Sequence, residues 1–245
     1  CSKSSEHSPA QSEIITHAIE TTALDGSRVS RVGVSPNGKF YLSWIEKGPE
    51  RSHSLKLAFF ENHKWSAPST IAAGRGWMVN WADFQSVVAD AEGNMAAQWL
   101  ETIEDTRNYG VKVSVSSDAG KTWGSPFWLH SDLKSSEHGF VSIVPESKGV
   151  FRACWLDARS HESKGNMELL SARFSAAGRL GEEHQIDARV CDCCATSTAL
   201  ANGTPVIAYR DRSTKEIRDI SLSRFEDGNW SKPLSVYPDN WLIPG

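Results

Sequence analysis

The stretch GNMAAQWLE, residues 93–101, recurs three more times in altered form along the 245-residue chain. The other copies are GKFYLSWIE at 38–46, GVFRACWLD at 149–157 and GTPVIAYRD at 203–211. Each copy begins with a glycine, has an aromatic residue six positions later and an acid two positions after that, and successive copies are 55, 56 and 54 residues apart. A fixed period of this length indicates a repeat architecture.

Each repeat also contains further segments with the alternating apolar pattern that is typical of β-strands. One precedes the glycine, as at residues 87–89, and another follows the acid, as at residues 111–115. A turn then leads to Trp-Ser/Gly-x-Pro, which occurs at Trp65, Trp123 and Trp230. Four short strands per repeat predict an all-β fold, namely a β-propeller in which each repeat forms one four-stranded blade.

The repeats also predict the organisation of the chain. The expected blades are residues 28–79, 80–138, 139–189 and 190–239. Before them, residues 13–22 have the pattern of an extra strand that closes the last blade, and after them residues 240–245 resemble the start of a further blade. Because a ring usually needs more than four blades of this size, we expect the chain to be part of a longer, six-bladed propeller. A closed four-bladed ring is the alternative.

Composition excludes several classes of protein. Hydrophobic residues make up 39% and charged residues 23% of the chain, which is typical of a folded globular protein. The formal net charge is -4, so no basic surplus indicates nucleic acid as a partner. No apolar run approaches about 18 residues, the length that indicates a membrane-spanning helix.

The first residues resemble the start of a mature bacterial lipoprotein. Cys1 is followed by a polar, Ser-rich stretch through Ser12. The resemblance implies a tether over residues 1–12, a propeller over residues 13–245 and attachment to the membrane through a lipid on Cys1. It also implies a place in the bacterial cell envelope, either periplasmic or at the outer membrane and facing outward. The alternative is a chain that merely begins with a cysteine.

One turn carries a known motif. Residues 116–123, SSDAGKTW, match the pattern S-x-D-x-G-x-T-W through Ser116, Asp118, Gly120, Thr122 and Trp123. This pattern resembles the Asp-box, the bacterial neuraminidase repeat of sialidase-like propellers. The aspartate of such a turn accepts backbone N–H groups, so the motif indicates the fold rather than the chemistry. Residues 61–65 and 226–230 look like degenerate copies.

The resemblance to sialidases implies particular site residues. Arg28 and Arg210 stand where two members of an arginine triad would hold a substrate carboxylate. The third arginine and the nucleophilic tyrosine of that family would follow residue 245. No aspartate lies in residues 51–54, where the acid/base would be, and Cys194 stands in the register of the glutamate that polarises the tyrosine. The resemblance therefore implies binding or hydrolysis of acidic glycans, with an incomplete catalytic set.

In a propeller, the loops after the second strands and the links between blades share one face, called the top face. Besides Arg28, the candidates for substrate binding on this face are Asp157, Arg159, Arg210, Asp211 and Arg212. They either form a polar binding site or make salt bridges at the strand ends. The repeat-wise acids Glu46 and Glu101 favour salt bridges.

The sharpest feature of the sequence is Cys191-Asp192-Cys193-Cys194, with Cys154 on a neighbouring blade. Such a cluster of thiols is able to bind copper(I) or zinc, and a non-enzymatic metal-binding or interaction propeller built around it is the alternative function. A disulfide is the first alternative, and a redox pair at C-x-x-C spacing is the second. The cysteine run and the segment around Arg210 together resemble a poorly characterised group of bacterial sialidase-like lipoproteins. This resemblance implies no mechanism.

Five histidines belong to no recognisable site motif. They fall in expected loops or in the tether, without a partner at motif spacing: His7, His17, His63, His130 and His138. We expect most of them to be exposed to solvent.

Overall fold

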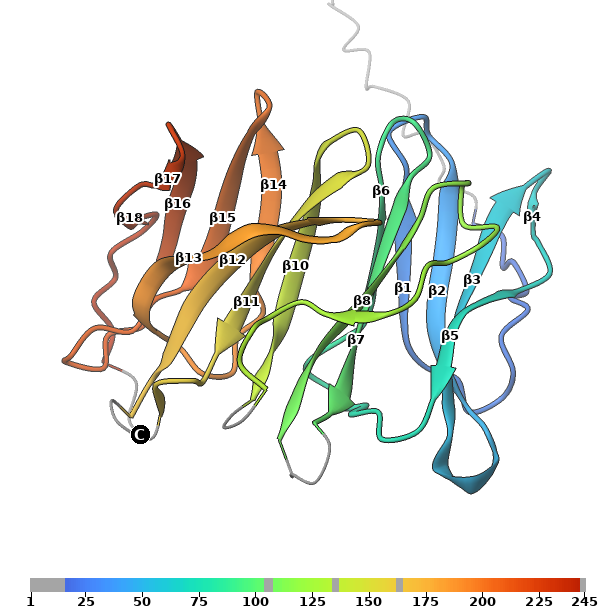
Figure 1. Cartoon of the computed structure of the whole chain (residues 1–245), viewed down its shortest axis with the longest axis horizontal. Coiled ribbons are helices and arrows are strands. Elements are labelled where there is room, and N and C mark those ends of the chain that lie inside the picture. The colour runs from blue at the N-terminus through green and yellow to red at the C-terminus, as the bar shows by residue number, and fades with distance from the viewer. Residues whose placement is uncertain (1–15, 104–107, 134–136, 162–164, 243–245) are drawn as a thin grey trace, which may run out of the picture.

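The computed structural model describes residues 16–103, 108–133, 137–161 and 165–242, which form four antiparallel sheets (Figure 1). The first contains β1 (Arg28–Val34), β2 (Phe40–Lys47), β3 (His53–Glu61), β4 (Lys64–Trp65) and β5 (Ser69–Gly74). The second contains β6 (Ser86–Ala89), β7 (Met95–Thr102), β8 (Tyr109–Ser116) and β9 (Phe127–Trp128). The third contains β10 (His138–Ser147), β11 (Val150–Asp157), β12 (Met167–Ser175) and β13 (Gly178–Val190). The fourth contains β14 (Ser197–Ala201), β15 (Thr204–Arg210), β16 (Ile220–Glu226), β17 (Asn229–Trp230) and β18 (Leu234–Ser235).

These sheets are the blades that the repeat predicts, so the expected all-β fold of four-stranded blades is confirmed, with four blades visible. They lie side by side in chain order, and the innermost strands β1, β6, β10 and β14 contact one another in that order (Figure 1). Residues from all four innermost strands line a central channel of about 260 Å³. Strands β6 and β10 are mostly buried, whereas β1 and β14, at the two ends of the row, are largely exposed.

The hydrophobic core lies between neighbouring sheets. One cluster joins the first two blades through side chains such as Leu57 and Met95, and another joins the second and third through Val113 and Phe151. Because successive side chains of a strand point to opposite faces of the sheet, every second side chain lies in such a cluster. Each blade therefore needs a neighbour to complete its core.

The aromatic residue of the repeat is the largest side chain in each core, and three of the four are tryptophans that are at most 2% exposed. A buried indole needs an acceptor for its N–H group. The acid two positions later supplies it, because residues i and i+2 of a strand point to the same face. The N–H to carboxylate distances are 2.9 Å for Trp44–Glu46, 3.2 Å for Trp99–Glu101 and 2.9 Å for Trp155–Asp157.

The turn at residues 116–123 is held by its own side chains. Asp118 accepts hydrogen bonds from the Thr122 backbone N–H at 2.8 Å and the Thr122 hydroxyl at 2.6 Å, and Ser116 donates to it at 2.8 Å. Gly120, at φ +79°, takes the left-handed conformation that the turn requires. The hairpins at residues 61–64 and 226–229 differ from this turn. They are two-residue turns with positive φ at both central residues, as in type I′ hairpins, so they are not copies of the Asp-box.

The flanking segments differ from the expected extra strand. Residues 16–24 are not in a strand, and Thr22 donates to the Ser66 carbonyl at 3.3 Å, beside the outer edge of the first blade rather than the last. Cys1 and the expected tether over residues 1–12 lie outside the described residues, so the lipid anchor stays a prediction. No helix among the described residues has the length and apolar character to cross a membrane.

Replacing Asp118 with Ala should lower the thermal unfolding midpoint, because the turn then loses its acceptor. Bonds from Thr122 and Ser116 lower the pKa of Asp118 to about 2. A depressed pKa means that the stabilisation is present above the ordinary aspartate pKa and is lost as pH falls through about 2. Thermal melts of the wild type, Asp118→Ala and the control Lys121→Ala between pH 7 and pH 2 test this. A gap between wild type and Asp118→Ala that stays constant over this range would contradict it.

Candidate functional site

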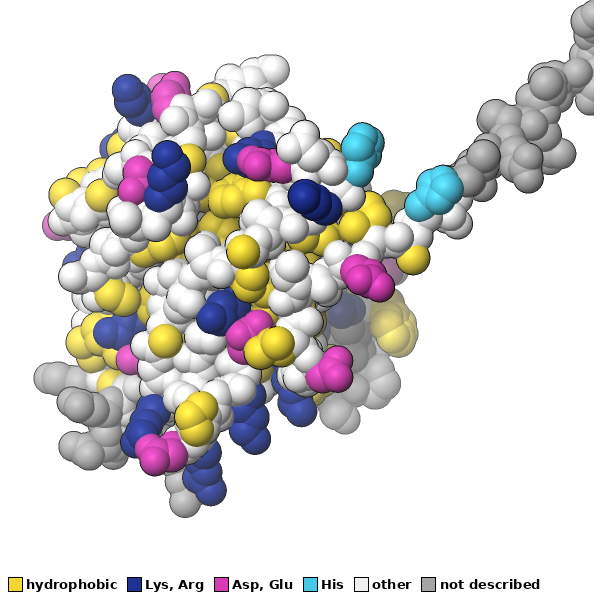
Figure 2. Space-filling model, turned by 90° about the vertical axis from the view of Figure 1, so that its right-hand side faces the viewer, with side chains coloured by type: hydrophobic (Ala, Val, Ile, Leu, Met, Phe, Trp, Pro, Cys, Tyr) yellow, Lys and Arg dark blue, Asp and Glu magenta, His cyan; other side chains and the backbone are white. Residues whose placement is uncertain are grey.

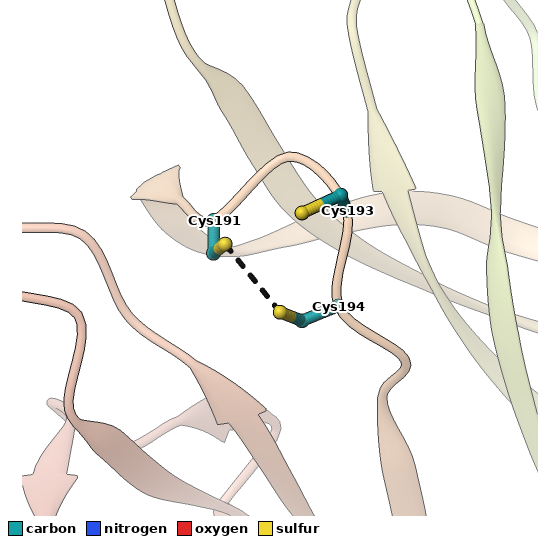
Figure 3. Close-up of side chains that lie close together, drawn as sticks. All are labelled: Cys191, Cys193 and Cys194. Carbon is teal, nitrogen blue, oxygen red and sulfur yellow. Dashed lines mark hydrogen bonds between the residues drawn. The ribbon is translucent and has the colours of Figure 1, made fainter. Parts of the chain in front are cut away.

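The top face of the propeller lies at the lower edge of Figure 1, where the chain leaves the second strand of each blade and enters the next blade. The thiol cluster lies here, in the link between β13 and β14 (Figure 3). The sulfurs of Cys191, Cys193 and Cys194 all lie within 4.8 Å of one another, and those of Cys191 and Cys194 are 3.5 Å apart. Cys191 is buried and Cys193 is exposed, so the cluster opens to solvent on one side.

Guanidinium groups surround the sulfurs. Arg210 Nη1 lies 3.8 Å from the Cys194 sulfur, and Arg218 Nη1 lies 3.7 Å from the Cys191 sulfur. Hydrogen bonds from Cys194 and Arg218 lower the pKa of the Cys191 thiol to about 5, whereas the pKa of Cys194 is raised. These contacts favour the thiolate form of Cys191 over that of Cys194.

Cys154 is not part of this cluster. Its position in β11 pairs it with Ser142 and Ser171 in the centre of the third blade, where it is fully buried. Burial raises the pKa of its thiol to about 12. Cys154 therefore behaves as a small core residue.

Arg212 and Asp211 make structural contacts beside the cluster. Arg212 Nη1 donates to both carboxylate oxygens of Asp192, at 2.9 and 3.0 Å, and Arg212 Nε contacts Glu216 at 3.0 Å. Asp211 accepts a bond from the Ser221 hydroxyl at 3.1 Å. The structure thus places Arg210 against the thiols, where the Arg218 carbonyl holds its guanidinium, and places Arg212 on Asp192 of the same turn.

Asp157 and Arg159 belong to a buried charge network. Asp157 is fully buried and pairs with Arg159 through two bonds of 2.7 and 2.9 Å. Arg159 also pairs with Glu183 at 2.7 Å. Burial alone would raise the pKa of Asp157, but His138 and Arg159 outweigh it and lower this pKa well below the usual range. These two residues link strand ends and do not form an open binding site.

The expectation that His130 and His138 are exposed is wrong. They are 2% and 0% exposed, and their rings stack with centroids 3.8 Å apart. His138 Nδ1 lies 3.0 Å from Asp157 Oδ2, although it is not aligned for a hydrogen bond. Burial lowers the pKa of His130 to about 3. Strand β10 begins at His138, which the sequence placed at the end of the second blade, and this strand position buries the ring.

Arg28 lines a separate pocket of about 410 Å³ between the first two blades. The other charged or ionisable side chains that line it are Lys47, Arg51 and His53, and no acid is among its described lining residues. Seen from the end of the first blade, Lys and Arg side chains lie at both the lower and the upper edge of the molecule, with Asp and Glu side chains among them (Figure 2). No ion pair joins Arg28, Lys47 or Arg51 to an acid among the described residues. The pocket is therefore cationic and uncompensated.

Two buried nitrogens beside this pocket have no hydrogen-bond partner: Trp77 Nε1 and His53 Nδ1. The two rings stack at 6.3 Å, and Trp77 stacks in turn on Trp99 at 5.3 Å. Burial, followed by the charges of Lys47 and Arg28, lowers the pKa of His53. An unpartnered buried polar atom indicates a missing partner such as a water or a ligand.

Arg28 and Arg210 line different pockets, since Arg210 faces a smaller one of about 290 Å³ beside Tyr237. The structure therefore does not bring the two expected carboxylate-binding arginines into one pocket. The residues that sequence reasoning missed are Lys47, Arg51 and His53, which carry no motif. One feature of the sequence could have indicated these residues. They flank the loop between two expected strands of one blade, and Arg28 of the same blade lies ten residues before the repeat glycine.

Asp83 is a further residue that carries no sequence motif. It is 4% exposed, and its Oδ2 accepts the Phe140 backbone N–H at 2.7 Å, which joins the second and third blades. A Cβ at position 139 would collide with this oxygen, so a larger residue there would displace the Asp83 carboxylate. Burial raises the pKa of Asp83 to about 7.

Comparison with known proteins shows similarity in structure alone. No family model matches the sequence, and no curated protein sequence matches it. The chain aligns with a Hadza microbial sialidase at a TM-score of 0.56 and 17% identity, covering 86% of this chain and 45% of that one. It aligns with the alpha-L-arabinanase of Penicillium chrysogenum complexed with arabinobiose at 0.52 and 13%, covering 84% and 64%. A neuraminidase-like protein, subtype N10, from A/little yellow-shouldered bat/Guatemala/060/2010 aligns at 0.53 and 12%, covering 84% and 57%.

At these identities the likeness shows the fold, which is a β-propeller of the kind found in sialidase-like and arabinanase structures. The chain spans less than two thirds of the length of each of these three structures. The expected sialidase-like architecture is thus confirmed at the level of the fold.

Replacing Asp157 with Ala should destabilise the protein by about 3–5 kcal/mol, because it removes the buried acid that pairs with Arg159 and accepts the Trp155 indole N–H. The matched control is Glu46→Ala, which removes the equivalent acid of the first blade and should cost about 1–3 kcal/mol through the orphaned indole N–H. Urea unfolding monitored by circular dichroism measures both. Equal costs would mean that the network around Asp157 adds no stability.

Replacing Asp83 with Asn should stabilise the protein more at pH 8 than at pH 5. A raised pKa means that the folded state holds a proton that the unfolded state releases, so wild-type stability falls as pH rises from about 4 through about 7. Each pKa unit corresponds to about 1.4 kcal/mol. Urea titrations at both pH values test the difference, and a benefit that does not grow with pH would refute the assignment.

Proposed function

We propose that this propeller binds acidic glycans, with a carboxylate-bearing sugar held in the cationic pocket at Arg28, Lys47, Arg51 and His53. The observation that carries the proposal is the pocket itself. It gathers three cations and an imidazole without an acid to neutralise them. A carboxylate would compensate this charge and would accept charge-assisted hydrogen bonds from the guanidiniums.

The shape and lining of the pocket also suit a sugar. A volume of about 410 Å³ is within the range of small-ligand sites. Trp77 contributes an aromatic wall on which a sugar ring could stack. The propeller fold is shared with a sialidase and an arabinanase, which is consistent with a carbohydrate ligand.

Binding without hydrolysis fits the pocket best. A retaining or inverting glycosidase needs two carboxyl groups at the scissile bond, or one with another nucleophile. The described residues that line this pocket include no Asp, Glu or Tyr. The carbohydrate role proposed for this chain is therefore recognition, and a place in the bacterial cell envelope through a lipid on Cys1 remains part of the same proposal.

Calorimetry with sialyllactose and oligogalacturonate, against lactose and a neutral oligosaccharide, tests the function. We expect binding of at least one acidic ligand and none of its neutral counterpart. Replacing both Lys47 and Arg51 with Ala should weaken binding about tenfold or more per cation. The matched control is Arg224→Ala, which removes an exposed arginine of the fourth blade paired with Glu226. Equal binding of neutral and acidic ligands, or an unaffected double variant, would exclude the proposal.

The affinity for an acidic ligand should rise as pH falls from 8 to 5.5. His53 has a lowered pKa in the empty pocket and is neutral at pH 7, whereas a bound carboxylate favours its protonated form. Binding is thus coupled to proton uptake by His53. The His53→Gln variant should flatten this pH profile, and an identical profile in that variant would show that His53 does not contact the ligand.

A further inference from the structure

We propose that Cys191, Cys193 and Cys194 form a second site, which binds one copper(I) ion through three thiolates. This site is separate from the acidic-glycan pocket. It lies on the link into the fourth blade, whereas the pocket lies between the first two blades. Either site is able to exist without the other.

The ligand set favours a soft ion of low coordination number. Three sulfurs converge within 4.8 Å of one another, in the bend of a four-residue turn (Figure 3). Among the described residues, this group contains no histidine or carboxylate. Asp192 lies inside the turn, but its carboxylate is occupied by Arg212. Structural zinc takes four protein ligands, whereas copper(I) is satisfied by soft sulfur ligands and accepts three.

The surrounding charge favours a monovalent ion over a divalent one. Arg210 and Arg218 each direct a guanidinium N–H at a sulfur, at 3.8 and 3.7 Å. Their positive field repels a dication more strongly than a monocation. Three thiolates around copper(I) carry two net negative charges, and the two guanidiniums compensate them. With zinc, only one negative charge would remain to compensate.

The guanidiniums are held before any ion binds. Arg210 Nε donates to the Arg218 carbonyl at 2.9 Å, and Arg218 Nη2 donates to Glu216 at 2.9 Å. The backbone N–H of Cys191 is bonded to the Arg210 carbonyl at 3.0 Å, which fixes the turn against β15. Groups that orient metal ligands in this way usually change metal affinity about 10–100-fold when they are removed. The exposed Cys193 supplies the route of entry.

The test uses the full chain carrying Cys1→Ser, so that the four described cysteines are the only thiols. The protein is reduced, stripped of metal and titrated anaerobically with copper(I) against a chromogenic copper(I) chelator. A parallel titration uses Zn²⁺. We expect about one copper(I) per chain, three sulfur neighbours by X-ray absorption and a preference for copper(I) over zinc.

Matched variants separate ligands from bystanders. Cys193→Ser and Cys194→Ser should each weaken copper(I) binding by more than about a hundredfold, since ligand loss exceeds the effect of an orienting group. Cys154→Ala should leave it unchanged. Arg218→Met should weaken copper(I) binding about tenfold and reduce the preference over zinc. Its control is Arg189→Met, because Arg189 pairs with the same Glu216 at 2.9 Å without a bond to sulfur.

Three outcomes would overturn the proposal. One is zinc binding that is tighter than copper(I) binding. Another is copper(I) affinity that is unchanged in Cys193→Ser, a variant of an exposed residue that should fold normally. The last is a reduced chain that takes up no copper(I) and reoxidises to a disulfide between Cys191 and Cys194, which would make the turn a structural staple.

Discussion

The structure depends on one interaction, the hydrogen bond from the buried indole N–H of a repeat tryptophan to the acid that follows it. In three blades the acid two residues further along the strand provides the acceptor, as in Trp99 and Glu101. The aromatic ring can then fill the core between two sheets, and truncating such a ring to alanine typically costs about 3–5 kcal/mol. The same bond explains why an acid lies at or next to the end of the second strand in each of these blades. These acids therefore serve the core, although they lie at the top face.

The fourth blade departs from this arrangement. Tyr209 replaces the tryptophan, and its hydroxyl donates to Asp187 of the preceding blade at 2.8 Å. Asp211 is thereby released from the aromatic residue and accepts a bond from Ser221. The thiols and their guanidiniums lie beside this altered strand end. A departure from a repeat pattern often marks a functional site. In this chain the departure lies beside the turn that contains the three cysteines.

The fold could be predicted from the sequence because its signals are local and periodic. Glycine turns, alternating strands and buried aromatics recur with each blade, and the structure places them as the period indicates. The candidate sites were less predictable, since they depend on contacts between blades. The Cys191–Cys194 cluster could be found because its members are close in sequence. The pocket around Lys47 and His53 could not, because its walls come from separate segments, and neither could the burial of His138 against Asp157.

The stack of Trp77 on Trp99 has an optical consequence. Their ring centroids are 5.3 Å apart, with an angle of 26° between the planes, and Trp77 also forms a wall of the cationic pocket. Indoles at this separation couple their electronic transitions, and the coupling depends on ring orientation. The chain therefore contains its own spectroscopic probe. A change in the aromatic circular dichroism or fluorescence of this pair would report occupancy of the pocket without any attached label.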